Sequence, residues 1–337
     1  MDSCKLPERI DVHCHAVPEK YREKLIKNGF QNPDGMPAIP PWDAEIHLQL
    51  MKDRNISRSI LSITSPGTNL TPNNAAEATT TTRQTNEELS SICRSHPEHF
   101  SFFASLPLPL VSESIQEIDY TLDTLGAVGF TIISNAHGLY LGDPTFTPVL
   151  EKLNSRKATI FIHPTTCNLI IPESHPFVKP VTVLPYPRPM MEFMFDETRV
   201  VANILLSGLL DTYPDLTFIM SHCGCTLPPI IDRIGAFDAI LCGREDSSQR
   251  FKDLLKRRFY FDLAGKPFPE QIHGLVRMLG GAGEASSRLV YGSDFPFTRE
   301  KAVIGLQDLM EGGLEEIFGK EVMGDIYVGN ARKLLNL

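Results

Sequence analysis

Arg9-Ile10-Asp11-Val12-His13-Cys14-His15 alternates apolar and polar side chains, a pattern typical of a short β-strand. Successive side chains of a strand point to opposite faces, so His13 and His15 project to the same side. Two imidazoles on one face form half of a metal site, because a catalytic ion takes further ligands from elsewhere and keeps one position open. The spacing alone fits an ordinary pair of histidines equally well, so the rest of the chain has to decide.

Composition and charge describe an ordinary globular chain. Of the 337 residues, 42% are hydrophobic and 22% are charged, as in typical soluble domains. The net charge is -9, and Lys256-Arg257-Arg258 is the largest basic group. These values argue against nucleic acid or an anionic membrane as a partner. An acidic small molecule would need positive charge concentrated at a metal or at a few arginines.

Neither a secretory signal nor a membrane span is visible in the sequence. The first eight residues lack the apolar core of a signal peptide, and no run of about 18 apolar residues occurs. The seven cysteines are scattered and odd in number, which favours reduced thiols. We therefore expect a cytoplasmic protein.

Seven further short apolar runs follow the first, and each is separated from the next by enough residues for a helix. They cover residues 59–63, 100–105, 128–133, 159–162, 216–220, 259–261 and 288–291. Helices are expected from residue 42, over 112–125 and over 145–154. Unbroken apolar strands that alternate with helices are typical of a parallel sheet. The pattern predicts an α/β fold, a single-domain (β/α)8 TIM barrel over residues 1–337.

One connection is much longer than the others. Residues 164–191 follow the fifth apolar run and contain many prolines. A loop of that length on a barrel is usually functional, so we expect a lid-like insertion or an oligomer contact there.

Polar side chains follow several of the apolar runs directly. In a (β/α)8 barrel the catalytic groups cluster at the C-terminal ends of the strands, because all eight βα loops converge there. Five ligand-competent or proton-transferring residues occupy such positions: His13, His15, His163, His222 and Asp294. A single such residue after a strand is often only a loop residue, but five of them on one rim indicate a shared site.

These residues carry a resemblance to a known family. The pattern His13-x-His15, His163, His222 and Asp294 resembles the amidohydrolase superfamily, in the variant without a carboxylated lysine that is typical of decarboxylases related to aminocarboxymuconate-semialdehyde decarboxylase. The resemblance runs from Arg9 to about Leu335 and includes segments 138–144, 195–199, 222–224 and 291–296. Segments 34–37 and 62–68 look closer still to fungal 6-methylsalicylate decarboxylases. Cys223 and Cys225 depart from the Gly-rich run that often follows the sixth-strand histidine in relatives.

The resemblance implies a metal-dependent carboxy-lyase. It assigns His13, His15, His163 and Asp294 to one divalent ion, Zn²⁺ with Mn²⁺ as the alternative. The implied reaction is non-oxidative decarboxylation of a small aromatic carboxylic acid, here 6-methylsalicylate to m-cresol and CO₂. Our hypothesis is that Asp294 also delivers the proton to the ipso carbon, while His222 organises its protonation or relays the proton.

Five further residues are candidates for substrate contact. Ser65 closes the second apolar run, and Asn135 and His137 follow the fourth, although Asn135 suits a turn equally well. Arg199, which we expect to open the helix after the insertion, could hold the lid. Arg233 matches an arginine that in relatives reaches into the neighbouring subunit's site, which implies a homodimer or tetramer. A solvated helix arginine is the alternative.

Two other functions remain open at this point. The same barrel could hydrolyse a lactone or amide, with His222 activating a water at the metal. It could also be a scaffold without activity, although five intact rim residues speak against that. No phosphate loop or nucleotide fingerprint is visible, and Gly280-Gly281-Ala282-Gly283 is too short to count as one.

Overall fold

The computed structural model describes residues 6–168, 185–243 and 245–337. Most of the long insertion, residues 169–184, lies outside this description, and the lid interpretation lies outside it as well. Eight parallel strands form one sheet in sequence order. They are β1 (Arg9–His15), β2 (Ile56–Ser62), β3 (Phe100–Ser105), β4 (Gly129–Ile133), β5 (Thr159–His163), β6 (Thr217–Met220), β7 (Phe259–Asp262) and β8 (Leu289–Val290).

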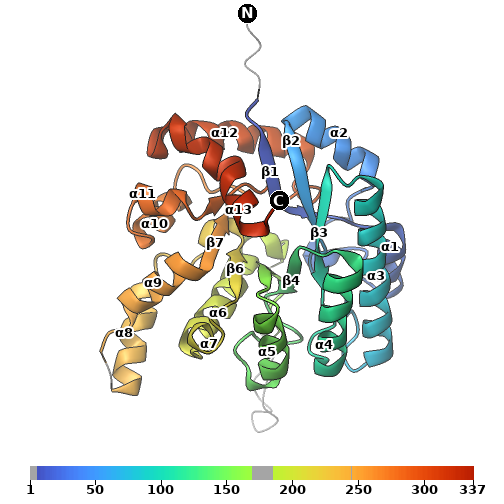
Figure 1. Ribbon diagram of the computed structural model, residues 1–337, viewed down its shortest axis with the longest axis horizontal. Helices are drawn as coiled ribbons and strands as arrows, with labels where there is room; N and C mark the ends of the chain where they lie inside the picture. Colours follow the sequence, from blue (N-terminus) through green and yellow to red (C-terminus); the bar gives the residue numbers. More distant parts are fainter. Residues whose placement is uncertain (1–5, 169–184, 244) are drawn as a thin grey trace, which may run out of the picture.

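Backbone hydrogen bonds join the two ends of the sheet. Val12 N donates to Tyr291 O over 3.1 Å, and the amide of Asp294 donates to His13 O over 2.7 Å. The strands therefore encircle a central axis with the helices outside them, as Figure 1 shows. The predicted (β/α)8 barrel is confirmed, and each apolar run coincides with a strand to within a few residues.

The helices fill the connections between strands. Their bounds are α1 (Glu19–Lys27), α2 (Ala44–Arg54), α3 (Ala75–Ser95), α4 (Val111–Tyr120), α5 (Thr147–Ser155), α6 (Glu192–Leu206), α7 (Leu209–Thr212), α8 (Ile231–Cys242), α9 (Ser248–Arg258), α10 (Gln271–Met278), α11 (Ala282–Ser286), α12 (Glu300–Phe318) and α13 (Asn330–Leu335). The helix expected from residue 42 begins two residues later, because Asp43 caps it by accepting from Ile46 N over 2.7 Å. Among the described residues, no helix is both long and apolar enough to cross a bilayer.

The interior of the barrel is a packed apolar core. Seven strands contribute to it through Ile10, Val12, Ile60, Phe103, Phe161, Ile219, Tyr260 and Val290, all nearly or fully buried. β4 contributes Gly129, where an added Cβ would lie 2.5 Å from Thr159 O and 3.1 Å from the Phe103 ring. The missing side chain thus leaves room for its neighbour's ring.

The face of β1 that points into the barrel changes before the strand reaches the rim. Val12 belongs to the interior core, yet His13 and His15 also face inward, which strict alternation does not allow. The register between β1 and β2 shifts between Asp11 and Cys14, and such an irregularity re-aims the following side chains. The His13 ring lies 4.9 Å from the Phe161 ring, so the polar layer rests directly on the core.

Candidate metal centre and active-site cavity

Four predicted ligands meet at the C-terminal end of the barrel. His13 and His15 end β1, His163 ends β5, and Asp294 follows β8. One ligand atom from each lies within 4.8 Å of the others. The Nε2 atoms of His13 and His15 are 3.2 Å apart, and Asp294 Oδ1 lies 3.5 Å and 3.2 Å from them. The structure therefore brings together residues up to 281 positions apart in sequence, as the rim argument predicted.

Ser62 fixes the tautomer of His15. The Ser62 hydroxyl donates to Cys14 O over 2.8 Å, so its oxygen accepts at its other contact. That contact is His15 Nδ1 at 3.0 Å. His15 therefore carries its proton on Nδ1 and turns the lone pair of Nε2 toward the centre of the cluster.

The other two imidazoles are held in the same way. His13 Nδ1 lies 2.9 Å from Asp262 Oδ2, and bonds from His13 lower the pKa of Asp262 despite the opposing effect of burial. His163 Nδ1 lies 2.8 Å from Pro164 O, which can only accept. Each Nδ1 therefore donates, and each Nε2 is left as a ligand atom.

This geometry fits a divalent metal ion. Three Nε2 atoms converge, and those of His13 and His15 lie 3.2 Å apart, close enough to share one cation. Burial lowers the pKa of His15 and, more strongly, of His163, which keeps both rings neutral and ready to coordinate. The pKa of His13 is raised although burial opposes this, because Asp262 and Asp294 favour positive charge at that position.

Asp294 reaches the cluster through an unusual backbone conformation. Its φ is 58°, in the left-handed region that aspartate tolerates better than most residues. Thr298 Oγ1 donates to Asp294 Oδ2 over 2.9 Å, which leaves Oδ1 toward the imidazoles. Burial would raise its pKa, but contacts with His13 and His15 hold it well below the usual value, so the group is a carboxylate.

His222 lies beside the four candidate ligands, and its backbone shares the carboxylate of Asp262 with His13. Its ring centroid lies 4.9 Å from that of His13, and burial lowers its pKa. Its backbone N donates over 3.0 Å to Asp262 Oδ1, the second oxygen of the carboxylate that holds His13. Asp262 was not among the site residues predicted from the sequence. The signal was present, because Asp262 follows the apolar run 259–261 as the other five follow theirs.

The turn at His222 places this histidine and the two cysteines after it at positive φ, a region that favours glycine. His222, Cys223 and Cys225 have φ values of 50°, 55° and 53°, and both thiols are buried and free. Gln271 Nε2 donates to the carbonyls of His222 and Cys225 over 2.7 Å and 3.2 Å. The corner that the sequence left undefined is thus a tight turn, closed by the side chain of the first residue of α10.

A cavity of about 450 Å³ opens in front of this cluster. His163, His222 and Asp294 line its polar end. Its other described walls combine an apolar part (Met36, Met190, Phe193, Met194, Phe297) with a polar part (Asp34, Thr64, Ser65), and the exposed Lys266 lies on its lining as well. Such a shape, mostly apolar with a few directed polar groups, suits a small organic ligand.

The structure distributes the predicted substrate contacts over several places. Ser65 lines the catalytic cavity, where its hydroxyl lies 2.7 Å from Thr165 Oγ1. Asn135 and His137 line a neighbouring cavity of about 420 Å³ instead. Asn135 also forms part of a turn, since its Oδ1 accepts from Gly138 N over 2.9 Å.

Neither predicted arginine lines the catalytic cavity in the described structure. Arg199 lies in the middle of α6 rather than at its start, and its guanidinium lies 3.2 Å from Asp196 Oδ1 one turn earlier. The guanidinium of Arg233 lies 4.6 Å from the ring centroid of Phe237 on the same helix, α8.

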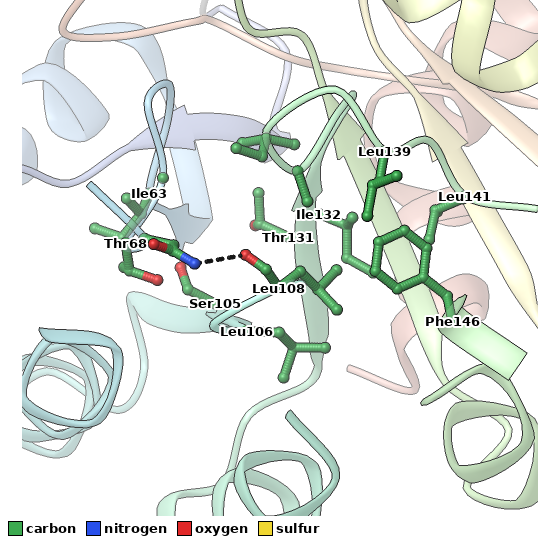
Figure 2. A pocket seen from close by; sticks show the side chains of 14 residues that line it. Ile63, Thr68, Ser105, Leu106, Leu108, Thr131, Ile132, Leu139, Leu141 and Phe146 are labelled. Atoms are coloured by element: carbon green, nitrogen blue, oxygen red, sulfur yellow. Dashed lines mark hydrogen bonds between the residues drawn. The ribbon is translucent and has the colours of Figure 1, made fainter. Parts of the chain in front are cut away.

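A third, much smaller cavity lies behind the strand ends. Figure 2 shows apolar side chains such as Ile63, Leu108 and Phe146 facing one another around a space of about 30 Å³. The hydrogen bond drawn there joins Asn69 Nδ2 to Leu108 O over 3.0 Å. None of its described lining residues carries a metal-ligating side chain, so it is a packing gap rather than a second centre.

Comparisons with known proteins agree with this geometry. The amidohydrolase family profile matches residues 10–337. Decarboxylase yanB of Aspergillus niger is 34% identical over 97% of this chain and 87% of its own, and 6-methylsalicylic acid decarboxylase of Penicillium expansum is 30% identical over 90% and 89%. The crystal structure of an amidohydrolase II superposes with a TM-score of 0.85 at 29% identity, over 98% of this chain and 100% of that one. The chain is therefore an enzyme of the carboxy-lyase class, and it belongs to the amidohydrolase family, in the branch that contains the fungal decarboxylases.

Proposed function

We propose that this enzyme decarboxylates 6-methylsalicylate to m-cresol and CO₂ without an oxidant. The observation that carries the proposal is the convergence of three fixed Nε2 atoms and Asp294 Oδ1 at the end of a cavity of about 450 Å³. A relative at 30% identity bears the name of this activity. A single substituted ring fits such a volume, and its acid group would lie at the polar end.

The proposed ion is Zn²⁺, with Mn²⁺ as the alternative, because three imidazoles and a carboxylate suit either. His13, His15, His163 and Asp294 would hold it. When bound, the cation supplies the positive charge that orients the substrate's carboxylate and neighbouring phenolate and offsets their negative charge.

The chain's own side chains enclose the ring and supply the proton. Phe193, Met194 and Phe297 pack against the ring and keep water from it. A proton is delivered to the ipso carbon, which breaks the ring's aromaticity. The C–C bond to the carboxylate then breaks, and its electron pair restores the aromatic ring as CO₂ leaves. We assign the delivery of the proton to Asp294, which is a carboxylate in the free enzyme and first takes the proton from the substrate's phenol hydroxyl as that group becomes a phenolate. His222 relays or organises this transfer from its position against the His13 ring.

Single-turnover reactions in D₂O test this assignment. Asp294→Asn and His222→Ala should each form deuterated m-cresol at least about 100-fold more slowly than the unaltered enzyme, as is usual when a general acid is removed. His222→Ala should keep its metal, since His222 is not among the four ligands. If Asp294→Asn retains metal and decarboxylates at near the original rate, Asp294 is not the donor. Ring opening of lactones without CO₂ release would favour the hydrolase instead.

We also propose that the enzyme works as a homodimer or a tetramer, in the cytoplasm. Helix α8 exposes Phe237, Ile240 and Leu241, at 47%, 74% and 80% of their surface. Three large apolar side chains on one helix are typical of a subunit interface rather than of a solvated surface. Arg233 lies on the same helix, which is where a residue shared between subunits would have to be.

A further inference from the structure

Asp34 stands between the two large cavities. It belongs to the short turn Pro33–Gly35 between α1 and α2, and it is the one described residue that lines both the catalytic cavity and the cavity of Asn135 and His137. Its φ of 54° lies in the left-handed region, where Asp and Asn are tolerated and most other side chains are strained. The turn therefore presents a specific carboxyl to the cavity.

Side chains at the ends of β2 and β5 hold this carboxyl in place. Thr166 Oγ1 donates to Asp34 Oδ1 over 2.5 Å, and the Ser65 hydroxyl forms a further hydrogen bond with it. Ser65 is itself bonded to Thr165 over 2.7 Å. Thr165 and Thr166 directly follow His163 and Pro164, so the clamp is built on the same strand end as one metal ligand. The position of Asp34 relative to the metal centre is thus fixed by the barrel.

Within the described residues, the half-buried Asp34 carboxyl is held by hydroxyl donors rather than by an ion pair. Burial raises its pKa, and the bonds from Thr166 and Ser65 oppose this only in part, while the charge of Arg188 acts more weakly than either hydroxyl bond. Thr166 and Ser65 donate to this carboxyl, and its remaining lone pairs are left for a donor supplied by a ligand in the cavity. The apolar lining residues Met190, Phe193 and Phe297 cannot supply one.

We infer that Asp34 is a specificity-determining residue that accepts a hydrogen bond from a second ring hydroxyl of the substrate, away from the edge that carries the carboxylate. This inference rests on the proposed function and extends it: salicylates with a further ring hydroxyl, including hydroxylated 6-methylsalicylates, are preferred over 6-methylsalicylate itself. The substrate's own carboxylate is repelled by Asp34 and is directed to the metal end. A hydroxyl at the far edge then fixes the rotation of the ring within the cavity.

A site built to bond a hydroxyl discriminates strongly against an analogue that lacks the donor, because the buried acceptor is then left unpaired. The discrimination can reach about 10⁴-fold in a closed site, and we expect about tenfold or more in this open cavity. Replacement of the ring hydroxyl by a methoxyl group keeps the oxygen and removes the proton. A comparison of the two compounds therefore measures the effect of the hydrogen-bond donor.

The test compares each hydroxysalicylate with its methoxy counterpart at ring positions 3, 4, 5 and 6, using the zinc-loaded enzyme and initial rates of CO₂ release. The unaltered enzyme should favour hydroxyl over methoxyl at least tenfold in kcat/KM at one or more positions. Asp34→Asn tolerates the same φ and can keep the bond from Thr166, but it turns an amide donor toward the ligand. The preference should fall to within threefold of unity. Asp43→Asn, the same chemical change at the exposed cap of α2, should keep the full preference.

Two outcomes overturn the inference: no hydroxyl preference at any position in the unaltered enzyme, or an unchanged preference in Asp34→Asn. Metal content and near-UV circular dichroism of each variant show whether the site is intact. If the unaltered enzyme releases no CO₂ from any salicylate, the proposed function fails on its own. The same hydroxyl-to-methoxyl ratio is then read from Kd by calorimetry, which turnover no longer disturbs, and it supports or overturns the role of Asp34 separately.

Discussion

Replacement of Asp262 by Asn should weaken metal binding although Asp262 is not among the four converging ligands. Both oxygens of the carboxylate accept hydrogen bonds. Oδ2 accepts from His13 Nδ1, and Oδ1 accepts from the backbone amides of His222 and Ala264, both over 3.0 Å. All of these partners are donors, and an amide side chain offers only one acceptor. If Asn turns its NH₂ toward His13, that ring must move its proton to Nε2, where it blocks the metal. If Asn turns its NH₂ toward the backbone, two buried amides lose their acceptor.

Either orientation of the Asn side chain should lower the affinity for the metal. Loss of a side chain that orients a metal-ligating histidine costs about 10–100-fold in metal affinity, which corresponds to about 1.4–2.7 kcal/mol. We expect the upper half of that range, because Asp262 is fully buried and carries the charge that favours a cation beside His13. Ser62→Ala is the matched comparison. It removes one neutral acceptor from His15 Nδ1 and should fall at the lower end.

Zinc affinity is measured by titration of the metal-free proteins against a competing chelator of known affinity. Urea unfolding of the same metal-free samples separates loss of affinity from loss of fold. An Asp262→Asn protein that binds zinc within twofold of the unaltered protein would refute the tautomer argument. So would a Ser62→Ala protein with the larger loss.

Three further predictions concern stability and assembly. Burial raises the pKa of Glu197 to about 8, although its bonds with Ser221 oppose this. A folded-state pKa above the unfolded value means that the stabilisation is present at low pH and is lost as pH rises from about 5 to 8. Glu197→Gln should therefore flatten the decline of the free energy of unfolding over this pH range, measured by urea unfolding. A decline as steep as that of the unaltered protein would contradict this. Gly129→Ala should lower the free energy of unfolding in urea by about 1–3 kcal/mol, because the new methyl would overlap Thr159 O. Unchanged stability would show that the backbone of the neighbouring strand can move to make room for the methyl. Leu241→Asp should shift sedimentation from dimer to monomer at micromolar concentration, and an unaltered distribution would remove α8 from the interface.

The barrel and its ligands were predictable for a simple reason. Parallel strands buried on both faces are mostly apolar, so a histidine or an aspartate at the end of an apolar run is easily recognised in the sequence. The C-terminal ends of such strands meet at one rim, which places His13, His163 and Asp294 together without any knowledge of distances. Their convergence within 4.8 Å is therefore a consequence of topology.

The contacts around the ligands could not be predicted in the same way. Asp262 carried the same sequence signal as Asp294, and only the structure shows that it faces His13 and the His222 amide. The substrate contacts were harder still. Asn135 and His137 follow β4 at the rim, yet they turn into the neighbouring cavity. Asp34 lies in a short turn with no periodic pattern, where its left-handed φ, not its position in the sequence, aims it at the catalytic cavity.

One carboxylate links the part of the site that binds metal to the part that we propose moves a proton. Asp262 fixes the tautomer of His13 through one oxygen and the backbone of His222 through the other. A shift of β7 that improved one contact would stretch the other, because both oxygens belong to one rigid group. β7 is itself held between β6 and β8, with Tyr260 in the interior core. The packing of the barrel thus sets the spacing between the metal ligands and His222, so core substitutions such as Gly129→Ala should alter activity as well as stability.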